Sequence, residues 1–505
     1  IFRYIYELTP SCSILKRLWI SDLTEQTIRN GLNNLKNSSD YDNLYLSAKA
    51  RSEADWLIGM NGSIATTKVY RKGKVVSVGR VQTPTLNLIV KRFLENKNHI
   101  KQNIYTPSIS IKIAAVELEL NCTKNFNVKT RANEILNSIP EKIKLQKNIV
   151  INENKPTDLF DLTTLQRFMN IKYGFTAKKT LQVAQSLYEK HKALSYPRTD
   201  SKHLPTAMLD NVKDIINKIS KVELVPGINV ASVQQEANER INGNSCFNNN
   251  KITDHYAIIP TGHSSDVSKM DEDNKLLYLA VTRQFVAKFL ANEKLEVSTI
   301  IYNHNEAVFG TKTAKIINRG YKRVLDIKQV NGLELPEIES NALYSVIKKS
   351  VITTQTKPKP LFNEASLLGT MENAGKEVID KEKREAMKER GLGTPATRDS
   401  IIETLITRSY IVRKKKSLLP TDLGLNLIQN IGKFDVANVD MTANWEFKLK
   451  LIEKGVLPYF DFMDEIKIYT KKLTLDIFNL SGDNVLASEK KKIKGVNCPN
   501  CEGEL

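Results

Sequence analysis

The chain has 505 residues, which is too many for one compact core, and this length predicts about three to four domains. Hydrophobic residues make up 41% of the sequence, so each domain has enough apolar material to bury a core. The 75 Lys and Arg residues outnumber the 56 Asp and Glu residues, which gives a formal net charge of +19. This charge indicates a polyanionic partner such as nucleic acid, although an AT-rich genome would also enrich lysine.

The cysteines and the hydropathy pattern exclude two classes of protein. Cys12, Cys122 and Cys246 are isolated in the sequence, which favours a reducing cytosol over a disulfide framework. No apolar run approaches the roughly 20 residues that span a bilayer, so we expect no membrane segment. The chain starts at Ile1 without a methionine and stops just after Cys501, and we expect it to be a fragment of a longer protein.

The first sixty residues predict helices around one short strand. Residues 1–30 predict a helix, a loop and a strand at 18–20. A second helix follows, and Ser21 or Thr24 would cap it. Residues 44–60 predict a further helix, because apolar side chains recur there every three or four positions.

Two β-rich segments alternate with helical ones along the rest of the chain. Residues 104–120 alternate apolar and polar side chains, which predicts β-structure. Residues 161–190 predict two helices, with the break between them at Gly174. Helices are also predicted over 207–220, 272–292, 363–430 and 444–478, and short strands over 295–355 with a turn at Asn331-Gly332.

The order of these segments predicts a mixed α/β, multidomain protein with discontinuous domains. The strands of 95–157 and 293–357 are expected to pair with each other, and the helical block 158–292 would leave that domain and return to it. The Pro-rich stretch 356–360 predicts a boundary, and the polar, Lys-rich stretch 479–495 predicts a linker.

Tyr196 lies two residues before Arg198, in a run that predicts phosphate chemistry. A free phenol has a pKa of roughly 10 and is a poor nucleophile, and a guanidinium can stabilise phenolate character and clamp a phosphate. Pro197 favours extended backbone, in which residues two apart project from the same face. A surface Tyr beside an Arg is the alternative interpretation.

Three other runs carry candidate binding residues. Arg51 and Asp55 lie at i,i+4 on one helical face, with Trp56 beside them for stacking; a surface ion pair is the alternative. The run 77–86 contains a glycine, an Arg and a Gln that suit phosphate and base edges. The run 391–400 joins a Gly-rich turn to a helix N-terminus, which suits a backbone phosphate.

His255 is flanked by Asp254 and an apolar strand. A lone His is more often structural than catalytic. In this setting, however, it could serve as a cation or proton donor near a phosphate.

Five runs, taken in chain order, resemble the successive signature motifs of type IA DNA topoisomerases: those around Arg51, Ser77, Tyr196, His255 and Gly391. The stretch 16–24, the proline after Tyr196 and the form Thr394-Pro395-Ala396-Thr397-Arg398 resemble the bacterial DNA topoisomerase III subgroup in particular. The similarity covers about residues 1–480.

The resemblance implies a toroid of four domains in which the tyrosine domain lifts as a gate. The implied parts are a Toprim remainder at 1–30, a helical DNA-binding domain at 31–94 and 358–480, a hinge domain at 95–157 and 293–357, a gate domain at 158–292, and a linker with a truncated zinc ribbon at 481–505.

The resemblance also implies a mechanism. Tyr196 would attack one DNA strand and form a 5′-phosphotyrosyl link, another strand would pass, and the 3′-hydroxyl would reverse the reaction without ATP. Arg198 and His255 would act at the same phosphate. The residues implied to contact DNA are Arg17, Arg51, Asp55, Trp56, Ser77, Val78, Gly79, Arg80, Val81, Gln82, Thr199, Asp200, Thr394, Thr397 and Arg398.

Two departures from the family concern metals. Members carry an acidic Mg²⁺-binding cluster that would lie before Ile1, and nothing in the chain replaces it, so we expect this polypeptide alone not to relax DNA. Cys498 and Cys501 are only half of a zinc site, because tetrahedral zinc needs about four ligands.

Other protein classes fit less well. A tyrosine recombinase would need a dispersed Arg-His-Arg set before a late Tyr, and a relaxase would need a His-x-His clip that the six histidines do not form. A degenerate module that only binds single-stranded DNA remains open. A monomer is expected, with underwound or catenated DNA as substrate and a helicase and a single-strand binding protein as candidate partners.

Overall fold

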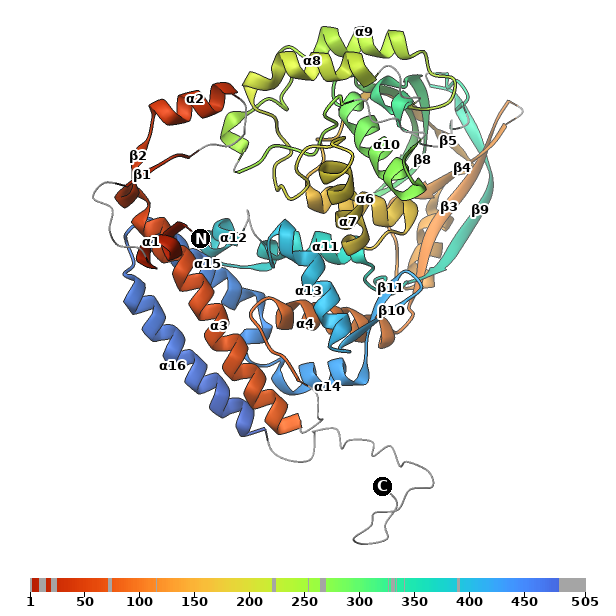
Figure 1. Ribbon diagram of the computed structural model, residues 1–505. Helices are drawn as coiled ribbons and strands as arrows, with labels where there is room; N and C mark the ends of the chain where they lie inside the picture. The colour runs from red at the N-terminus through yellow and green to blue at the C-terminus, as the bar shows by residue number, and fades with distance from the viewer. Residues whose placement is uncertain are drawn as a thin grey trace, which may run out of the picture. The chain divides into compact units, whose positions relative to one another are not determined.

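The computed structural model describes the chain apart from a set of short gaps and the C-terminal tail (Figure 1). The residues outside the described part are 1, 9–14, 20–24, 71–74, 115, 220–223, 253, 264–268, 326, 328–331, 333, 340, 388–390 and 481–505. Two compact units make up the fold, and each draws on separate stretches of sequence. The first unit comprises residues 1–94, 170–178 and 361–505, and the second unit comprises 95–169 and 179–360.

The first unit is mainly helical. Its helices include α1 (Phe2–Leu8), α2 (Glu25–Asn33), α3 (Asp42–Tyr70), α4 (Gln82–Lys97), α11 (Glu364–Glu372), α12 (Lys381–Met387), α13 (Pro395–Thr407), α14 (Asp422–Ile431), α15 (Val439–Glu453) and α16 (Tyr459–Phe478). Two small two-stranded sheets accompany them, β1 (Lys16–Arg17) with β2 (Lys36–Asn37), and the hairpin of β10 (Ile411–Lys414) with β11 (Ser417–Pro420). The long helix α3 packs along α15 and α16, and small residues such as Ala50, Ala54 and Gly62 allow this close approach.

The second unit is organised by a seven-stranded antiparallel sheet in the order β5-β9-β3-β4-β8-β7-β6. The strands are β3 (Asn103–Ile113), β4 (Val116–Cys122), β5 (Lys142–Lys144), β6 (Gln146–Asn154), β7 (Glu293–His304), β8 (Ala307–Asn318) and β9 (Leu343–Gln355). The helices are α5 (Lys129–Ser138), α6 (Leu162–Tyr173), α7 (Ala177–Glu189), α8 (Leu209–Lys218), α9 (Val230–Arg240) and α10 (Glu272–Ala287). Residues 170–178, at the end of α6 and the start of α7, belong to the first unit.

Strands from the two β-rich segments pair with each other, as their order in the sequence predicts. Strand β3 pairs with β9 from Asn103↔Gln355 onward, and β6 pairs with β7 from Gln146↔Ile301 to Asn154↔Glu293. Helices α6 to α10 occupy the sequence between β6 and β7, so the chain leaves the sheet and returns to it. The mixed α/β, multidomain fold class is therefore confirmed.

Several local expectations were wrong, and each has a physical reason. The strand expected at 18–20 is β1, two residues earlier, where Lys16 pairs with Asn37. The strands of 295–355 are long, because β7 and β8 form an extended hairpin. The 363–430 region contains the unexpected hairpin β10–β11, which Tyr410 and Thr421 close through their backbones. The 444–478 region is two helices, since Gly455 takes a left-handed φ of 71° between them.

Other local predictions are confirmed or lie outside the described residues. The helices of 44–60, 161–190, 207–220 and 272–292 are present as α3, α6 with α7, α8 and α10. Gly174 has a φ of 73°, which suits the turn between α6 and α7. The candidate caps Ser21 and Thr24 and the turn residue Asn331 fall outside the described part. Within that part, no helix is long and apolar enough to cross a membrane.

The close packing of the first unit predicts the result of a glycine substitution. A Cβ at Gly424 would lie 2.2 Å from the carbonyl oxygen of Tyr410, whereas a Cβ at Gly59 on α3 would meet nothing within 4 Å. We expect Gly424→Ala to destabilise the protein by about 1–3 kcal/mol, because the backbone must shift. Gly59→Ala, the control, should leave stability unchanged or raise it by less than about 1 kcal/mol. Thermal unfolding curves measure both, and equal midpoints for the two variants would contradict the packing.

Candidate functional site

The segment around Tyr196 has two faces that alternate with a period of two. Ser195, Pro197, Thr199 and Ser201 are buried, whereas Tyr196 and Arg198 are half-buried and Asp200 is exposed. This alternation is the pattern of extended backbone, and no helix forms here. Tyr196 and Arg198 therefore share the open face of the segment, as their spacing predicts.

The ring of Tyr196 lies between two other rings. Tyr188, near the end of α7, makes an edge-to-face contact with it, and the ring centroids are 5.4 Å apart. The imidazole of His255 lies closer, with a centroid separation of 4.5 Å and an interplanar angle of 50°. Such contacts limit the directions in which a ring can point. The structure thus brings together Tyr196 and His255, which are 59 positions apart in the sequence.

Backbone hydrogen bonds join the Tyr196 segment to the strand-like segment that follows His255. The Ser195 N–H donates to the Ile259 carbonyl (2.9 Å), and the Thr261 N–H donates to the Ala193 carbonyl (3.0 Å). Leu194 and Pro260 form an antiparallel bridge between these bonds. The two segments run antiparallel, and this pairing accounts for the contact of the two rings.

Thr199 is engaged within the protein. Its side chain is 3% exposed, and its hydroxyl donates to the carbonyl oxygen of His255 at 2.9 Å. The DNA contact predicted for Thr199 stays a prediction. Asp200, one residue further, is exposed.

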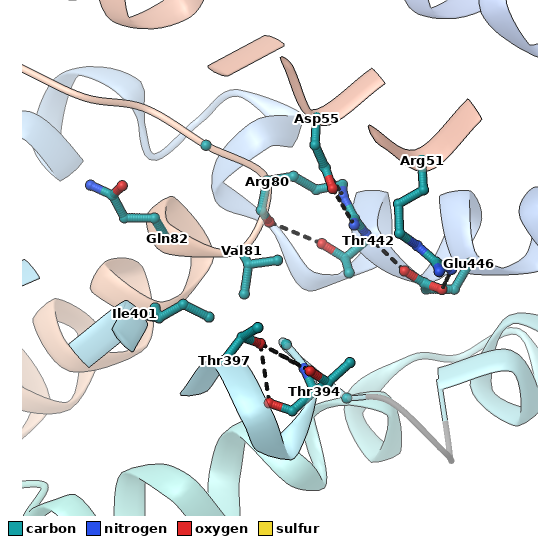
Figure 2. A pocket seen from close by; sticks show the side chains of 13 residues that line it. Arg51, Asp55, Arg80, Val81, Gln82, Thr394, Thr397, Ile401, Thr442 and Glu446 are labelled. Carbon is teal, nitrogen blue, oxygen red and sulfur yellow. Dashed lines mark hydrogen bonds and ion pairs between the residues drawn. The ribbon is translucent and has the colours of Figure 1, made fainter. Parts of the chain in front are cut away.

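The first unit contains a separate candidate site, a cavity of about 400 Å³ (Figure 2). The cavity is lined by Arg51, Asp55, Gly79, Arg80, Val81, Gln82, Gly391, Gly393, Thr394, Thr397, Ile401, Thr442 and Glu446. Helix α3 supplies Arg51 and Asp55, and helix α15 supplies Thr442 and Glu446. The run 79–82, which enters α4, forms another part of the lining, and the run from Gly391 into α13 forms the rest. Three of the runs that the sequence singled out therefore converge on one cavity.

A buried ion-pair network forms one wall of this cavity. Arg80, which is 6% exposed, donates from Nε and Nη2 to the two carboxylate oxygens of Asp55 (2.7 and 3.1 Å) and from Nη1 to Glu446 (3.1 Å). Its guanidinium also lies 5.2 Å from the ring centroid of Trp445. Burial alone would lower the pKa of Arg80, but the two carboxylates outweigh it and raise the pKa.

This network changes the interpretation of three predicted residues. Arg51 pairs with Glu446, and Asp55 pairs with Arg80, so each member of the expected i,i+4 pair binds a partner from another element. Arg80 uses its guanidinium for Asp55 and Glu446, and its predicted role as a phosphate or base donor stays a prediction. Arg51 is less buried than Arg80 and lines the cavity.

The N-terminus of α13 forms the opposite side of the cavity. The backbone N–H of Thr394 donates to the Thr397 hydroxyl at 3.0 Å, which caps the helix. A Cβ at Gly391 would lie 2.3 Å from the carbonyl oxygen of Met371, so only glycine fits there. Arg398 is 2% exposed, and its predicted contact with the DNA backbone stays a prediction.

The remaining predicted residues are distributed around these features. The amide of Gln82 donates to the Ser77 hydroxyl at 2.8 Å, and Val78 is buried below them. Trp56 is 61% exposed on α3 and does not line the cavity. The guanidinium of Arg17 lies 5.0 Å from the ring centroid of Tyr41, also outside the cavity.

Sequence reasoning missed Tyr188, Thr442 and Glu446. Glu446 binds both Arg51 and Arg80, and the Thr442 hydroxyl donates to the Arg80 carbonyl at 3.1 Å. All three lie inside helices with ordinary apolar spacing, and no local signal marks them.

The described residues do not fit a metal ion. Among them there is no group of three or more His, Cys, Asp or Glu side chains that could hold one. Cys498 and Cys501 lie outside the described part of the chain. We therefore derive no chemical step through a metal.

Comparison with known proteins identifies the family. The sequence profile described as DNA topoisomerase matches residues 39–464. The chain is 32% identical to DNA topoisomerase 3 of Bacillus licheniformis over 521 residues, which cover 99% of this chain and 69% of that protein. The identity to DNA topoisomerase 3 of Bacillus subtilis is 32% with the same coverage, and to that of Staphylococcus saprophyticus 31% over 96% of this chain and 67% of that protein. The chain therefore belongs to the DNA topoisomerase family, and its relatives and its fold identify the type IA class.

A solved structure supports the fold. Full-length topoisomerase I from Thermotoga maritima matches with a TM-score of 0.67 over 95% of this chain and 76% of that chain. The sequence identity to it is 22%, so this likeness concerns the fold alone. The sequence relatives and the family profile identify the protein as a DNA topoisomerase, an enzyme of the isomerase class.

The buried network makes a prediction about stability. Arg80→Met would leave Asp55 and Glu446 without their buried cation, and we expect a loss of about 3–5 kcal/mol in the free energy of unfolding. Lys467→Met removes the exposed pair of Lys467 with Asp464 in the same unit and should cost less than about 1 kcal/mol. Denaturant titration of both variants provides the measurement. Equal losses would show that the Arg80 network does not hold the cavity wall.

Proposed function

We propose that Tyr196 is the nucleophile of this topoisomerase and that it becomes covalently linked to a single DNA strand. The observation that carries the proposal is the contact of the Tyr196 and His255 rings, with Arg198 on the same open face. A phenol, a guanidinium and an imidazole at one surface are the groups that attack on a phosphodiester requires.

The proposed reaction is a reversible transesterification. The Tyr196 oxygen bonds to phosphorus, the bond from phosphorus to the 3′ oxygen breaks, and the phenol proton is lost while the 3′ oxygen gains one. The product is a 5′-phosphotyrosyl link and a free 3′-hydroxyl. One P–O bond replaces another, so religation needs no ATP. A second strand passes through the gap before the 3′-hydroxyl attacks the link and releases Tyr196.

Arg198 and His255 have separate roles in this proposal. Arg198 offers a planar fork of donors that suits the charge developing on the phosphate oxygens. His255 is exposed beside the Tyr196 ring, within reach of the same phosphate, where it can contact an oxygen or carry a proton.

We further propose that the cavity of the first unit binds single-stranded DNA. Arg51, Gln82 and the α13 N-terminus at Thr394 supply a cation, an amide and a positive helix end. The exposed ring of Trp56 suits base stacking. The net charge of +19 adds a general attraction for the phosphate backbone.

The rest of the proposal concerns the cellular setting. Relaxation of negative supercoils and decatenation in the bacterial cytoplasm are the proposed activities of an enzyme with a complete Mg²⁺ site, with a monomer as the working form. A helicase and a single-strand binding protein are the proposed partners, since each exposes or holds single strands. Mg²⁺ is the proposed cofactor, and Zn²⁺ is proposed only for a complete Cys site that includes Cys498 and Cys501.

A module that binds single-stranded DNA without cutting it is the second candidate function. The aromatic and basic residues of the first unit would suffice for it. The pairing of Tyr196 with His255 favours the enzyme, because binding alone does not require a phenol beside an imidazole.

Replacement of the proposed nucleophile separates these candidates. We expect Tyr196→Phe to abolish the covalent adduct with a single-stranded oligonucleotide, because the attacking oxygen is gone, while the dissociation constant stays within about twofold. Tyr188→Phe removes the neighbouring phenol and should still form the adduct. Denaturing gels of a labelled oligonucleotide provide the measurement. If wild-type protein binds the strand and forms no adduct, the binding module is the correct function.

The described residues contain no metal-binding cluster, and this leads to a further expectation. Because the described residues offer no cluster for Mg²⁺, we expect the 505-residue polypeptide not to relax supercoiled plasmid, with or without added Mg²⁺. Agarose gels of topoisomers, with a catalytically active topoisomerase as positive control, measure this. Relaxation that depends on Mg²⁺ in the polypeptide would contradict the expectation.

A further inference from the structure

The buried face of the Tyr196 segment carries three hydroxyl side chains at alternate positions, Ser195, Thr199 and Ser201. Each hydroxyl both donates and accepts a hydrogen bond with the backbone. Buried hydroxyls that are satisfied in this way hold the chain segments that they join, because breaking either bond leaves a buried polar group unpaired.

Ser195 directly precedes Tyr196 and joins it to the segment of His255. Its hydroxyl donates to the Ala257 carbonyl (3.0 Å) and accepts from the Ile259 N–H (2.9 Å). Ser195 is 6% exposed, and both of its partners are buried as well. The backbone on one side of Tyr196 is thus fixed by a side chain and by the Ser195 N–H together.

Thr199 holds the other side of the Tyr196–Arg198 stretch. Its hydroxyl donates to the carbonyl of His255 itself (2.9 Å) and accepts from the Ser201 N–H (3.1 Å). The Thr199 carbonyl accepts from the Leu162 N–H at the start of α6 (3.1 Å). One hydroxyl therefore links the Tyr196 segment directly to the residue whose ring contacts Tyr196.

Pro197 explains why hydroxyls are needed here. It has no N–H and lies between Tyr196 and Arg198, whereas the backbone bonds on both sides of the Leu194–Pro260 bridge are made. A regular ladder of backbone hydrogen bonds therefore cannot continue past Pro197. The side-chain hydroxyls supply the missing donors and acceptors on the buried face and leave the open face to Tyr196 and Arg198.

We propose that Ser195 and Thr199 are positioning residues that set the Tyr196 ring against His255 for the attack on DNA. The inference rests on the proposed function of Tyr196 and deepens it. Without these hydroxyls, the two segments would still meet through backbone bonds, but the rings would lose their fixed separation. A displacement of about 1 Å at reacting groups lowers rates by up to about 100-fold.

Rates of strand cleavage test the role of the hydroxyl. Thr199→Val keeps the side-chain volume and removes the hydroxyl, and Thr199→Ser restores it. We expect Thr199→Val to slow single-turnover adduct formation by about 10- to 100-fold with an unchanged oligonucleotide dissociation constant. Thr199→Ser should recover the rate to within about threefold. Ser195→Ala should lower the rate in the same way and provides a second test if Thr199→Val folds poorly.

The matched control is Thr261→Val, which lies in the same pair of segments. The Thr261 hydroxyl donates to the Lys192 carbonyl, beyond the bridge and away from both rings. We expect its adduct rate to equal that of the wild type. A wild-type rate in both Thr199→Val and Ser195→Ala would overturn the inference, as would a Thr199→Ser rate as low as that of Thr199→Val.

The geometry of the rings can be measured without any reaction. The chain has six histidines, so ¹³C-labelled histidine gives few NMR signals, and His255→Gln identifies the signal of His255. Its Cε1–H proton should carry a ring-current shift from Tyr196 that Tyr196→Leu removes. We expect Thr199→Val to move this signal toward its position in Tyr196→Leu, and Thr261→Val to leave it in place. An unmoved signal in Thr199→Val would refute the positioning role, even if the wild type forms no adduct and the proposed function fails.

Discussion

The antiparallel pairing of the Tyr196 segment with the segment after His255 is the constraint on which the candidate active site depends. Extended backbone separates the side chains of residues 195–201 into a buried and an open face. The buried face holds the segment in place, and the open face presents a phenol and a guanidinium. Pro197 interrupts the backbone ladder at this point, and hydroxyl side chains compensate. Alternate residues of this short run therefore have different roles: the buried ones hold the segment, and Tyr196 and Arg198 face outward for the proposed reaction.

A second constraint shapes the cavity of the first unit. A buried guanidinium is costly unless acids surround it, and Arg80 has Asp55 and Glu446 at hydrogen-bond distance. These residues come from α3, the junction before α4, and α15, so the ion pairs join three parts of the chain at one wall of the cavity. Arg80 is buried in this network, whereas Arg51, which also pairs with Glu446, is less buried and lines the cavity with the α13 N-terminus, where we propose that a DNA strand binds.

The sequence predicted much of the fold, because the strongest signals were periodic. Helix α3 and the two helices around Gly174 followed from apolar spacing, and the pairing of β3 with β9 followed from the order of segments. The hairpin β10–β11 was missed because four-residue strands inside a helical region give no clear period. The strand was expected at 18–20 because those residues are apolar. The observed strand lies at 16–17, where Lys16 pairs with Asn37, and polar residues of this kind give no strand signal in the sequence.

The site was predicted unevenly, for a reason that burial makes clear. Motifs located Tyr196, Arg198 and His255, and the structure brings the Tyr196 and His255 rings together. The same motifs assigned DNA contacts to Arg80, Thr199 and Arg398, which are buried. A motif marks residues that matter to a site, but it does not separate those that touch a ligand from those that hold the site in shape. Glu446 and Tyr188 escaped detection because their partners are distant in sequence.

The most direct test of the account is to identify the residue that carries DNA after cleavage. Tyr196 and Tyr188 are adjacent in space among 17 tyrosines, but trypsin places them in different peptides, residues 193–198 and 180–190. Mass spectrometry of the trapped adduct should find the nucleotide on Tyr196 in peptide 193–198 and on no other tyrosine. A nucleotide on Tyr188 or on any other residue would contradict the central claim that the open face of the Tyr196 segment is the reactive one.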